Sequence, residues 1–121
     1  MNKRAEGALY EQRAMVYLKE KGYKILDHNY FTKFGEIDII AYKDKGYVFV
    51  EVKYRTSEKH GHPYEAVTYT KQQRIMRSAM VFAQVNYALG QPMRFDVIDI
   101  LRDKLTHYEN AFELSKNLSN Y

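Results

Sequence analysis

The sequence contains no cysteine, no tryptophan and only two prolines. Without cysteine there can be no disulfide bond, iron–sulfur cluster or cysteine-ligated zinc, and such a composition is typical of a reducing compartment. Apolar runs are only a few residues long, and the first residues interleave charged with apolar types, so neither a membrane span nor an export signal is predicted. We therefore expect a cytoplasmic protein that does not rely on cysteine chemistry.

The chain has 121 residues, of which 45% are hydrophobic, and this is enough to form one buried core. We expect a single domain over residues 1–121, with its core over about 7–112 and a tail over 113–121. Nineteen Lys and Arg against fifteen Asp and Glu give a net charge of +4, a modest bias toward nucleic acid. Twelve tyrosines and six phenylalanines are either packing residues or stacking surfaces for unpaired bases, and composition leaves both open.

Residues 3–21 have the spacing of an amphipathic helix that ends at Gly22. One stripe at intervals of three and four residues contains Gly7, Tyr10, Glu11, Ala14, Tyr17 and Leu18. Glu11 lies in this inward row, where a carboxylate is costly unless something pairs with it. Leu9 and Val16 lie on the opposite side, and they are a candidate surface for a homodimer.

Five segments have the composition of strands, namely 23–30, 36–42, 47–55, 93–101 and 105–112. A short turn from Lys43 to Gly46 joins the second segment to the third, which predicts an antiparallel hairpin. If Asp44 and Lys45 form the centre of this turn, Asp38 lies opposite Glu51. The two carboxylates are therefore expected to be close together.

A second helix is predicted over Lys71–Leu89 because Thr70 and Gln73 form a capping box and Gly90 follows the last turn. Residues 56–69 between the third strand and this helix read as a loop. Segments 36–42 and 47–55 are apolar on both faces, as in strands that helices cover on both sides. The predicted fold is α/β, with a central mixed sheet of about five strands flanked by helices in the order α-β-β-β-α-β-β.

Charged residues follow the apolar part of the third strand. Glu51 and Lys53 share one face there, with Asp38 on the neighbouring strand and Glu11 facing inward from the first helix. Carboxylates a few ångströms apart repel one another, so the cluster requires a cation or raised pKa values. Mg²⁺ or Mn²⁺ suits carboxylate and carbonyl oxygens, and Asp38, Glu51 and the carbonyl of Val52 are the expected ligands. Lys53 is then placed to orient a bound water molecule or to stabilise the developing negative charge, and the implied reaction is phosphodiester hydrolysis.

Other residues have weaker patterns. Glu36 shares a strand face with Asp38 and either assists the site or ends the strand. His60 and His62 in the loop form a weak metal pattern. Asp96 and Asp99 fall on opposite faces of a strand and cannot serve one cluster, whereas His107 is expected to support structure. Three cations either contact phosphates near the site or cover helix and strand ends: Arg55, Lys71 and Arg74.

Five segments carry a resemblance to a known family. They are GEIDIIA from Gly35, FVEVKYR from Phe49, TKQQR from Thr70, RFDVI from Arg94 and HYENAF from His107. Together they resemble the YraN-type family of uncharacterised bacterial proteins over about residues 7–112. Within them, the spacing of Asp38, Glu51 and Lys53 resembles the metal site of the PD-(D/E)xK nuclease superfamily, and the layout is similar to archaeal Holliday-junction resolvases.

The resemblance implies a restriction-endonuclease-like fold and gives roles to residues. Asp38 and Glu51 would be metal ligands, Lys53 the catalytic lysine, and Glu11 the first-helix glutamate of the resolvase branch. Ile37 stands where the superfamily's name has a proline. The expected function is a Mg²⁺-dependent endonuclease acting on DNA, with branched junctions as one substrate. The alternatives are a non-catalytic nucleic-acid-binding module with the same fold and a structural domain with ordinary ion pairs.

Overall fold

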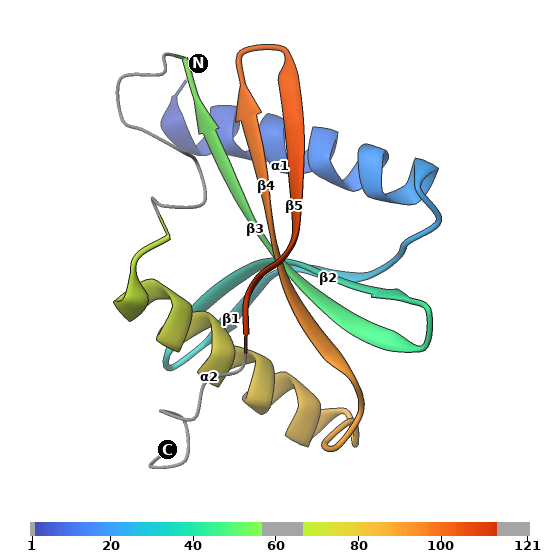
Figure 1. Cartoon of the computed structure of the whole chain (residues 1–121). Helices are drawn as coiled ribbons and strands as arrows, with labels where there is room; N and C mark the ends of the chain where they lie inside the picture. The colour runs from blue at the N-terminus through green and yellow to red at the C-terminus, as the bar shows by residue number, and fades with distance from the viewer. Residues whose placement is uncertain (1, 57–66, 114–121) are drawn as a thin grey trace.

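The computed structural model describes residues 2–56 and 67–113 as two helices and five strands (Figure 1). In chain order the elements are α1 (Lys3–Glu20), β1 (Lys24–Thr32), β2 (Gly35–Lys43), β3 (Gly46–Arg55), α2 (Tyr69–Val85), β4 (Met93–Leu101) and β5 (Lys104–Phe112). This is the predicted order, and the strand bounds agree with the sequence pattern to within two residues. Neither helix in this part of the chain is long and apolar enough to cross a bilayer.

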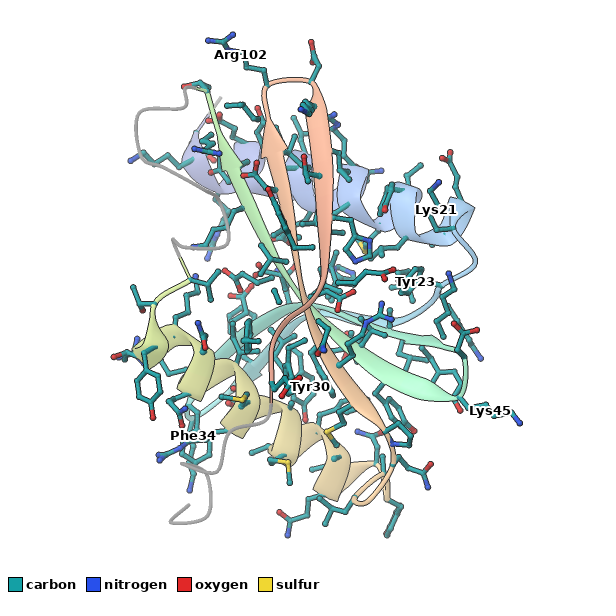
Figure 2. The ribbon with its side chains drawn as sticks, viewed as in Figure 1. Lys21, Tyr23, Tyr30, Phe34, Lys45 and Arg102 are labelled. Atoms are coloured by element: carbon teal, nitrogen blue, oxygen red, sulfur yellow. The ribbon has the colours of Figure 1, made fainter. Side chains whose placement is uncertain are left out.

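The strands form one sheet in the order β1-β2-β3-β4-β5, with β3 and β4 parallel and the other neighbours antiparallel. In the hairpin of β2 and β3, Ile39 pairs with Val50, as the predicted register requires. Asp44 and Lys45 between them have φ values of 52° and 67°. Positive φ at both central residues is the type I′ geometry that matches the twist of a two-residue hairpin. Lys45 lies at the tip of this hairpin (Figure 2).

The helices cover opposite faces of the sheet, and Figure 1 shows α1 and α2 crossing different halves of the strands. The core on the α1 side includes Ala14, Leu18, Ile39, Val50 and Ile98. The core on the α2 side includes Ile40, Phe49, Ile75, Phe82 and Phe95. Burial of both strand faces confirms the α/β sheet with helices on both sides. It also explains why β2 and β3 are apolar on both faces.

The start of α2 differs from the prediction. Thr68, rather than Thr70, is the N-cap, because its backbone is extended and its side-chain oxygen accepts a hydrogen bond from the Lys71 N–H at 3.2 Å. Thr70 lies within the first turn, so the predicted capping box was wrong. Asn2 caps α1 in the same way by accepting from the Ala5 N–H at 2.8 Å.

The end of α2 also comes earlier than predicted. The helix ends at Val85 instead of Leu89, and Tyr87 adopts a φ of 56°. The Asn86 side chain donates to the Phe82 carbonyl at 2.9 Å, which satisfies one carbonyl of the last turn. A residue in the left-handed region stops a helix, and Tyr87 does so before Gly90 is reached.

The strands β2 and β3 separate where Asp38 lies. Their ladder reaches Ile39 and Val50, and beyond this point β3 continues beside β4 as far as Arg55. Ile37 packs on the α2 side and Ile39 on the α1 side, although strict alternation would give both one face. The strand therefore rotates at Asp38. Side chains from both helices can approach this opening in the sheet.

Asp96 is fully buried on the α1 side of β4 and lies at the centre of a polar network. Arg94 donates to it through Nε and Nη2, both at 2.8 Å, and the Asn110 N–H donates at 2.9 Å. His107 Nε2 lies 2.6 Å from the same carboxylate. These residues belong to the RFDVI and HYENAF segments, so the two segments meet in the core. As predicted, Asp99 lies on the opposite face, where Arg55 approaches it to 3.4 Å.

Replacement Asp96→Asn is expected to lower the free energy of unfolding by about 2–4 kcal/mol at pH 7, because it leaves buried donors without their charged acceptor. Burial raises the pKa of Asp96, but hydrogen bonds from His107, Arg94 and the Asn110 N–H together lower it below the ordinary value. The contribution is therefore present above about pH 4 and is lost as the pH falls. Denaturant unfolding at several pH values measures it.

The matched control is Asp103→Asn, which makes the same chemical change at an exposed turn position. It should leave the unfolding midpoint unchanged. Equal stability of Asp96→Asn and the wild type at pH 7 would contradict a supporting role for the network.

Candidate functional site

Three carboxylates converge at the opening between β2 and β3. Glu11 comes from α1, and Glu36 and Asp38 come from β2, with one oxygen of each within 4.8 Å of the others. All three side chains are partly exposed to solvent. Burial raises the pKa of Glu11 despite the Asn29 hydrogen bond, and Glu36 raises it further. The cluster thus holds negative charge at a cost that a bound cation removes.

Asn29 connects two of these carboxylates. Its Nδ2 donates to Glu11 Oε1 and to Glu36 Oε1, both at 2.8 Å. Its backbone has a φ of 50°, a left-handed conformation that Asn tolerates better than most residues. This turn of the backbone within β1 aims the amide at the carboxylates. Asn29 therefore fixes their relative position.

Asp38 is held by the neighbouring strand. Its Oδ2 accepts a hydrogen bond from the Val52 N–H at 2.8 Å. Burial raises the pKa of Asp38 well above its ordinary value, and the nearby Glu51 raises it further, against the lowering effect of that hydrogen bond. Glu11 and Glu36 act in the same direction. The backbone thus orients Asp38, while three other carboxylates repel its negative charge.

Glu51 faces the α2 side of the opening and is buried. Lys71 Nζ, from the first turn of α2, lies 2.7 Å from Glu51 Oε1, and Lys53 Nζ lies 3.6 Å from the same oxygen. Burial lowers the pKa of Lys71, but Glu51 more than offsets this and the pKa is raised. Burial, and then the neighbouring Lys71, lower the pKa of Lys53. Two lysines therefore share one buried carboxylate, and their pKa values are shifted in opposite directions.

The structure brings two of the predicted ligands together, because Glu11 and Asp38 both lie in the carboxylate cluster. Glu51 and Lys53 lie on the α2 side, where Glu51 pairs with Lys71 and Lys53, and the role of Glu51 as a ligand stays a prediction. Val52 contributes its N–H to Asp38. The expected role of its carbonyl as a ligand stays a prediction.

The predicted phosphate-binding cations have different surroundings. Lys71 contacts Glu51, and Arg55 contacts Asp99. Arg74 is exposed and lies beside Gly35 of β2, where an added Cβ on the glycine would be 3.6 Å from the Arg74 Cβ. Lys71 therefore borders the opening from α2, whereas Arg74 lies beside the start of β2 and Arg55 lies at the end of β3. The two loop histidines, His60 and His62, lie outside the described residues.

Two contributions were missed or underrated at the level of sequence. Asn29 falls within a segment of strand composition, although Asn is disfavoured in strands and signals irregular backbone there. The strand pattern alone leaves Glu36 either assisting the site or ending the strand, and the structure places one of its oxygens within 4.8 Å of ligand atoms of Glu11 and Asp38. The pairing of Lys71 with Glu51 depends on how α2 packs, which local spacing does not reveal.

The donor set suits a hard divalent cation. Carboxylate oxygens are the ligands that Mg²⁺ and Mn²⁺ prefer, and Mg²⁺ usually keeps several waters while one or two protein carboxylates hold it. Four carboxylates around one opening exceed that need, and their mutual repulsion favours binding of positive charge.

Sequence comparison identifies the family of this chain. The model of the family described as "Uncharacterised protein family UPF0102" matches residues 10–100, which include every carboxylate of the site. This chain belongs to the UPF0102 family.

UPF0102 relatives match the chain over nearly its whole length. A UPF0102 protein of Lachnoclostridium phytofermentans is 47% identical over 115 residues, covering 93% of this chain and 97% of the relative. One of Alkaliphilus oremlandii is 49% identical over 119 residues, covering 93% and 100%. One of a Sulfurihydrogenibium species is 43% identical over 114 residues, covering 94% and 99%. The YraN-type resemblance of the five segments is thereby confirmed.

Replacement Asp38→Asn is expected to stabilise the metal-free protein at pH 8. It removes the negative charge of a carboxyl group whose pKa is raised, and it keeps an oxygen that can accept the hydrogen bond from the Val52 N–H. The sign follows from linkage: a carboxylate with a raised folded pKa costs stability above that pKa and nothing below its unfolded value near pH 4. The advantage of Asn should therefore disappear as the pH falls toward 4.

Unfolding in EDTA, followed by circular dichroism, measures this difference. Asp103→Asn at the exposed turn between β4 and β5 is the matched control and should not shift the midpoint. With Mn²⁺ added, the order should reverse, because only the wild type gains the binding energy of the ion. A destabilised Asp38→Asn protein in EDTA would show that the carboxylates do not repel one another.

Proposed function

We propose that the protein is a Mg²⁺- or Mn²⁺-dependent endonuclease that hydrolyses DNA phosphodiester bonds on a restriction-endonuclease-like fold. The observation that carries the proposal is the convergence of carboxylates from α1 and β2, namely Glu11, Glu36 and Asp38, at an opening between strands. Glu51 of β3, which pairs with Lys53, raises the pKa of Asp38 from the α2 side. A structural domain would gain little from repelling carboxylates and a lysine of lowered pKa in one place. The proposal agrees with the resemblance of Asp38, Glu51 and Lys53 to the PD-(D/E)xK site.

The metal would be held by Asp38 and Glu51 with the carbonyl of Val52, and Glu11 and Glu36 would hold it from the α1 side. When bound, such an ion polarises a phosphoryl oxygen and lowers the pKa of a coordinated water. In the metal-free protein, Lys71 places its positive charge against Glu51 at 2.7 Å. Release of Glu51 by Lys71 would leave that ammonium facing the opening, where a phosphate can take the place of the carboxylate.

Lys53 is proposed as the catalytic lysine. Its lowered pKa increases the fraction of neutral amine near physiological pH, and a neutral amine can accept a proton from a water molecule. Lys53 Nζ and Lys71 Nζ both lie close to Glu51 Oε1. A phosphate bound by Lys71 would therefore lie on the same side of the site as Lys53. Protonated Lys53 would stabilise the negative charge that develops on the phosphate oxygens.

The second candidate is a nucleic-acid-binding module that keeps the fold without cutting. The net charge of +4, Lys71 at the opening and the exposed Arg74 on the same helix favour binding in either case. The retained carboxylates distinguish the two, because they repel a phosphate backbone unless an ion neutralises them. Binding to DNA that requires Mg²⁺ or Ca²⁺ supports the nuclease, whereas binding of equal strength in EDTA favours the module.

Replacement Lys53→Ala is expected to lower the rate of DNA cleavage by about 100-fold or more, the usual cost of losing one group that stabilises the transition state. The assay incubates branched, nicked and linear DNA with Mg²⁺ or Mn²⁺ and resolves the products on denaturing gels. Asp38→Ala should abolish cleavage in the same assay, because it removes a proposed ligand.

The matched control is Lys104→Ala, which removes an exposed lysine at the start of β5. It should cut DNA at the wild-type rate. Circular dichroism must show that all three variants are folded. Absence of cleavage by the wild type on every substrate, together with no heat of Mn²⁺ binding by calorimetry, would overturn the nuclease proposal.

Symmetric cutting of a junction requires two centres, and we propose that α1 supplies the interface of a homodimer. Leu9 and Val16 on its outer side are 48% and 50% exposed, and they line one hollow together with Leu105. Light scattering should give twice the chain mass of 14.4 kDa for the wild type and a monomer for Val16→Lys. Val85→Lys, at an exposed position of α2, should stay dimeric. A monomeric wild type would contradict this interface.

A further inference from the structure

A hollow of about 650 Å³ adjoins the carboxylates on the side of the first turns of α1. Its lining includes Lys3 and Arg4 of α1, Phe31 of β1 and Tyr54 of β3, together with three residues of the candidate site. Glu11, Asn29 and Glu36 also belong to the carboxylate cluster. A molecule bound in this hollow therefore contacts the residues that position the site. Its volume falls within the range of about 300–1,000 Å³ that is typical of ligand pockets.

Two aromatic rings line the hollow. Phe31, near the end of β1, is 72% exposed. Tyr54, near the end of β3, stacks on Tyr10 of α1 with 4.4 Å between ring centroids and 11° between planes, so its orientation is fixed. Figure 1 shows the first turns of α1 beside this end of β3. An exposed phenylalanine on an edge strand gains by covering its ring, and the hollow leaves room for a flat partner.

Opposite charges occupy different parts of the hollow. Lys3 and Arg4 are exposed in the first turn of α1, whereas Glu11 and Glu36 lie at the end that faces Asp38. A ligand that carries an anionic group beside a flat ring system satisfies both the cations and the rings. An unpaired nucleotide has this chemistry, since its phosphates bind cations and its base stacks on aromatic faces.

We propose that this hollow binds an unpaired nucleotide of the DNA chain, with the base stacked on Phe31 and its phosphate near Lys3 and Arg4. In a continuous duplex the bases are stacked on one another and cannot reach the ring. The protein therefore selects DNA with an unpaired segment, such as a flap, a junction with open arms or a single strand. The selection of cutting sites rests on the proposed nuclease function, whereas the binding does not.

Fluorescence anisotropy with a labelled single strand, a flap and a blunt duplex, all in Ca²⁺ without Mg²⁺ or Mn²⁺, measures binding separately from cutting. Phe31→Leu should weaken binding of the single strand and the flap by about 5- to 100-fold, the usual range for loss of one stacked base. Phe31→Tyr keeps a ring and should bind as the wild type does. Tyr87→Leu, which removes a ring that is 96% exposed near the end of α2, is the matched control and should change nothing.

An oligonucleotide with abasic positions tests the contact from the DNA side. The wild type should bind it more weakly than the intact strand by the same factor as Phe31→Leu loses, and Phe31→Leu should bind both equally. Equal affinity of Phe31→Leu and the wild type for the intact single strand would overturn the proposal. So would a parallel loss on single strand and duplex. A wild type that binds in this way and never cuts refutes only the nuclease function, whereas cutting without dependence on Phe31 refutes only the stacking.

Discussion

The hydrogen bond from the Val52 N–H to Asp38 determines how the site is arranged. Where β2 and β3 separate, the backbone ladder ends, and an amide in a covered strand needs another acceptor. The Asp38 carboxylate supplies it. The same interaction that completes the hydrogen bonding of β3 therefore fixes a carboxylate between the two faces of the sheet, within reach of Glu11 from one helix and of the charge on Glu51 from the other side.

Two buried or partly buried aspartates in this chain have opposite environments. Asp96 is surrounded by donors from Arg94, His107 and Asn110, and its pKa is lowered despite burial. Asp38 accepts a hydrogen bond from the Val52 N–H but lies close to other carboxylates, and its pKa is raised. The first arrangement stabilises the fold without further partners. The second is stable only with protons or a cation, which is the usual property of a site that binds something.

Much of the fold followed from sequence because it depends on local rules. The hairpin register followed from the turn at Asp44 and Lys45, and the covered sheet followed from apolar residues on both faces of β2 and β3. The left-handed backbone at Asn29 and the partner of Lys71 were not predictable in this way. They arise from a break in strand geometry and from the packing of α2, and both are tertiary effects.

The parallel pairing of β3 with β4 has a consequence for the order of assembly during folding. Tyr47 pairs with Met93 across the whole of α2, whereas the hairpins of β2 with β3 and of β4 with β5 join near neighbours in sequence. Closing the longer loop costs more chain entropy, so this pairing has the higher contact order and is expected to limit the folding rate. The β2–β3 hairpin, which carries Asp38, Glu51 and Lys53, can form before that step, so nascent chains would display the acidic groups early.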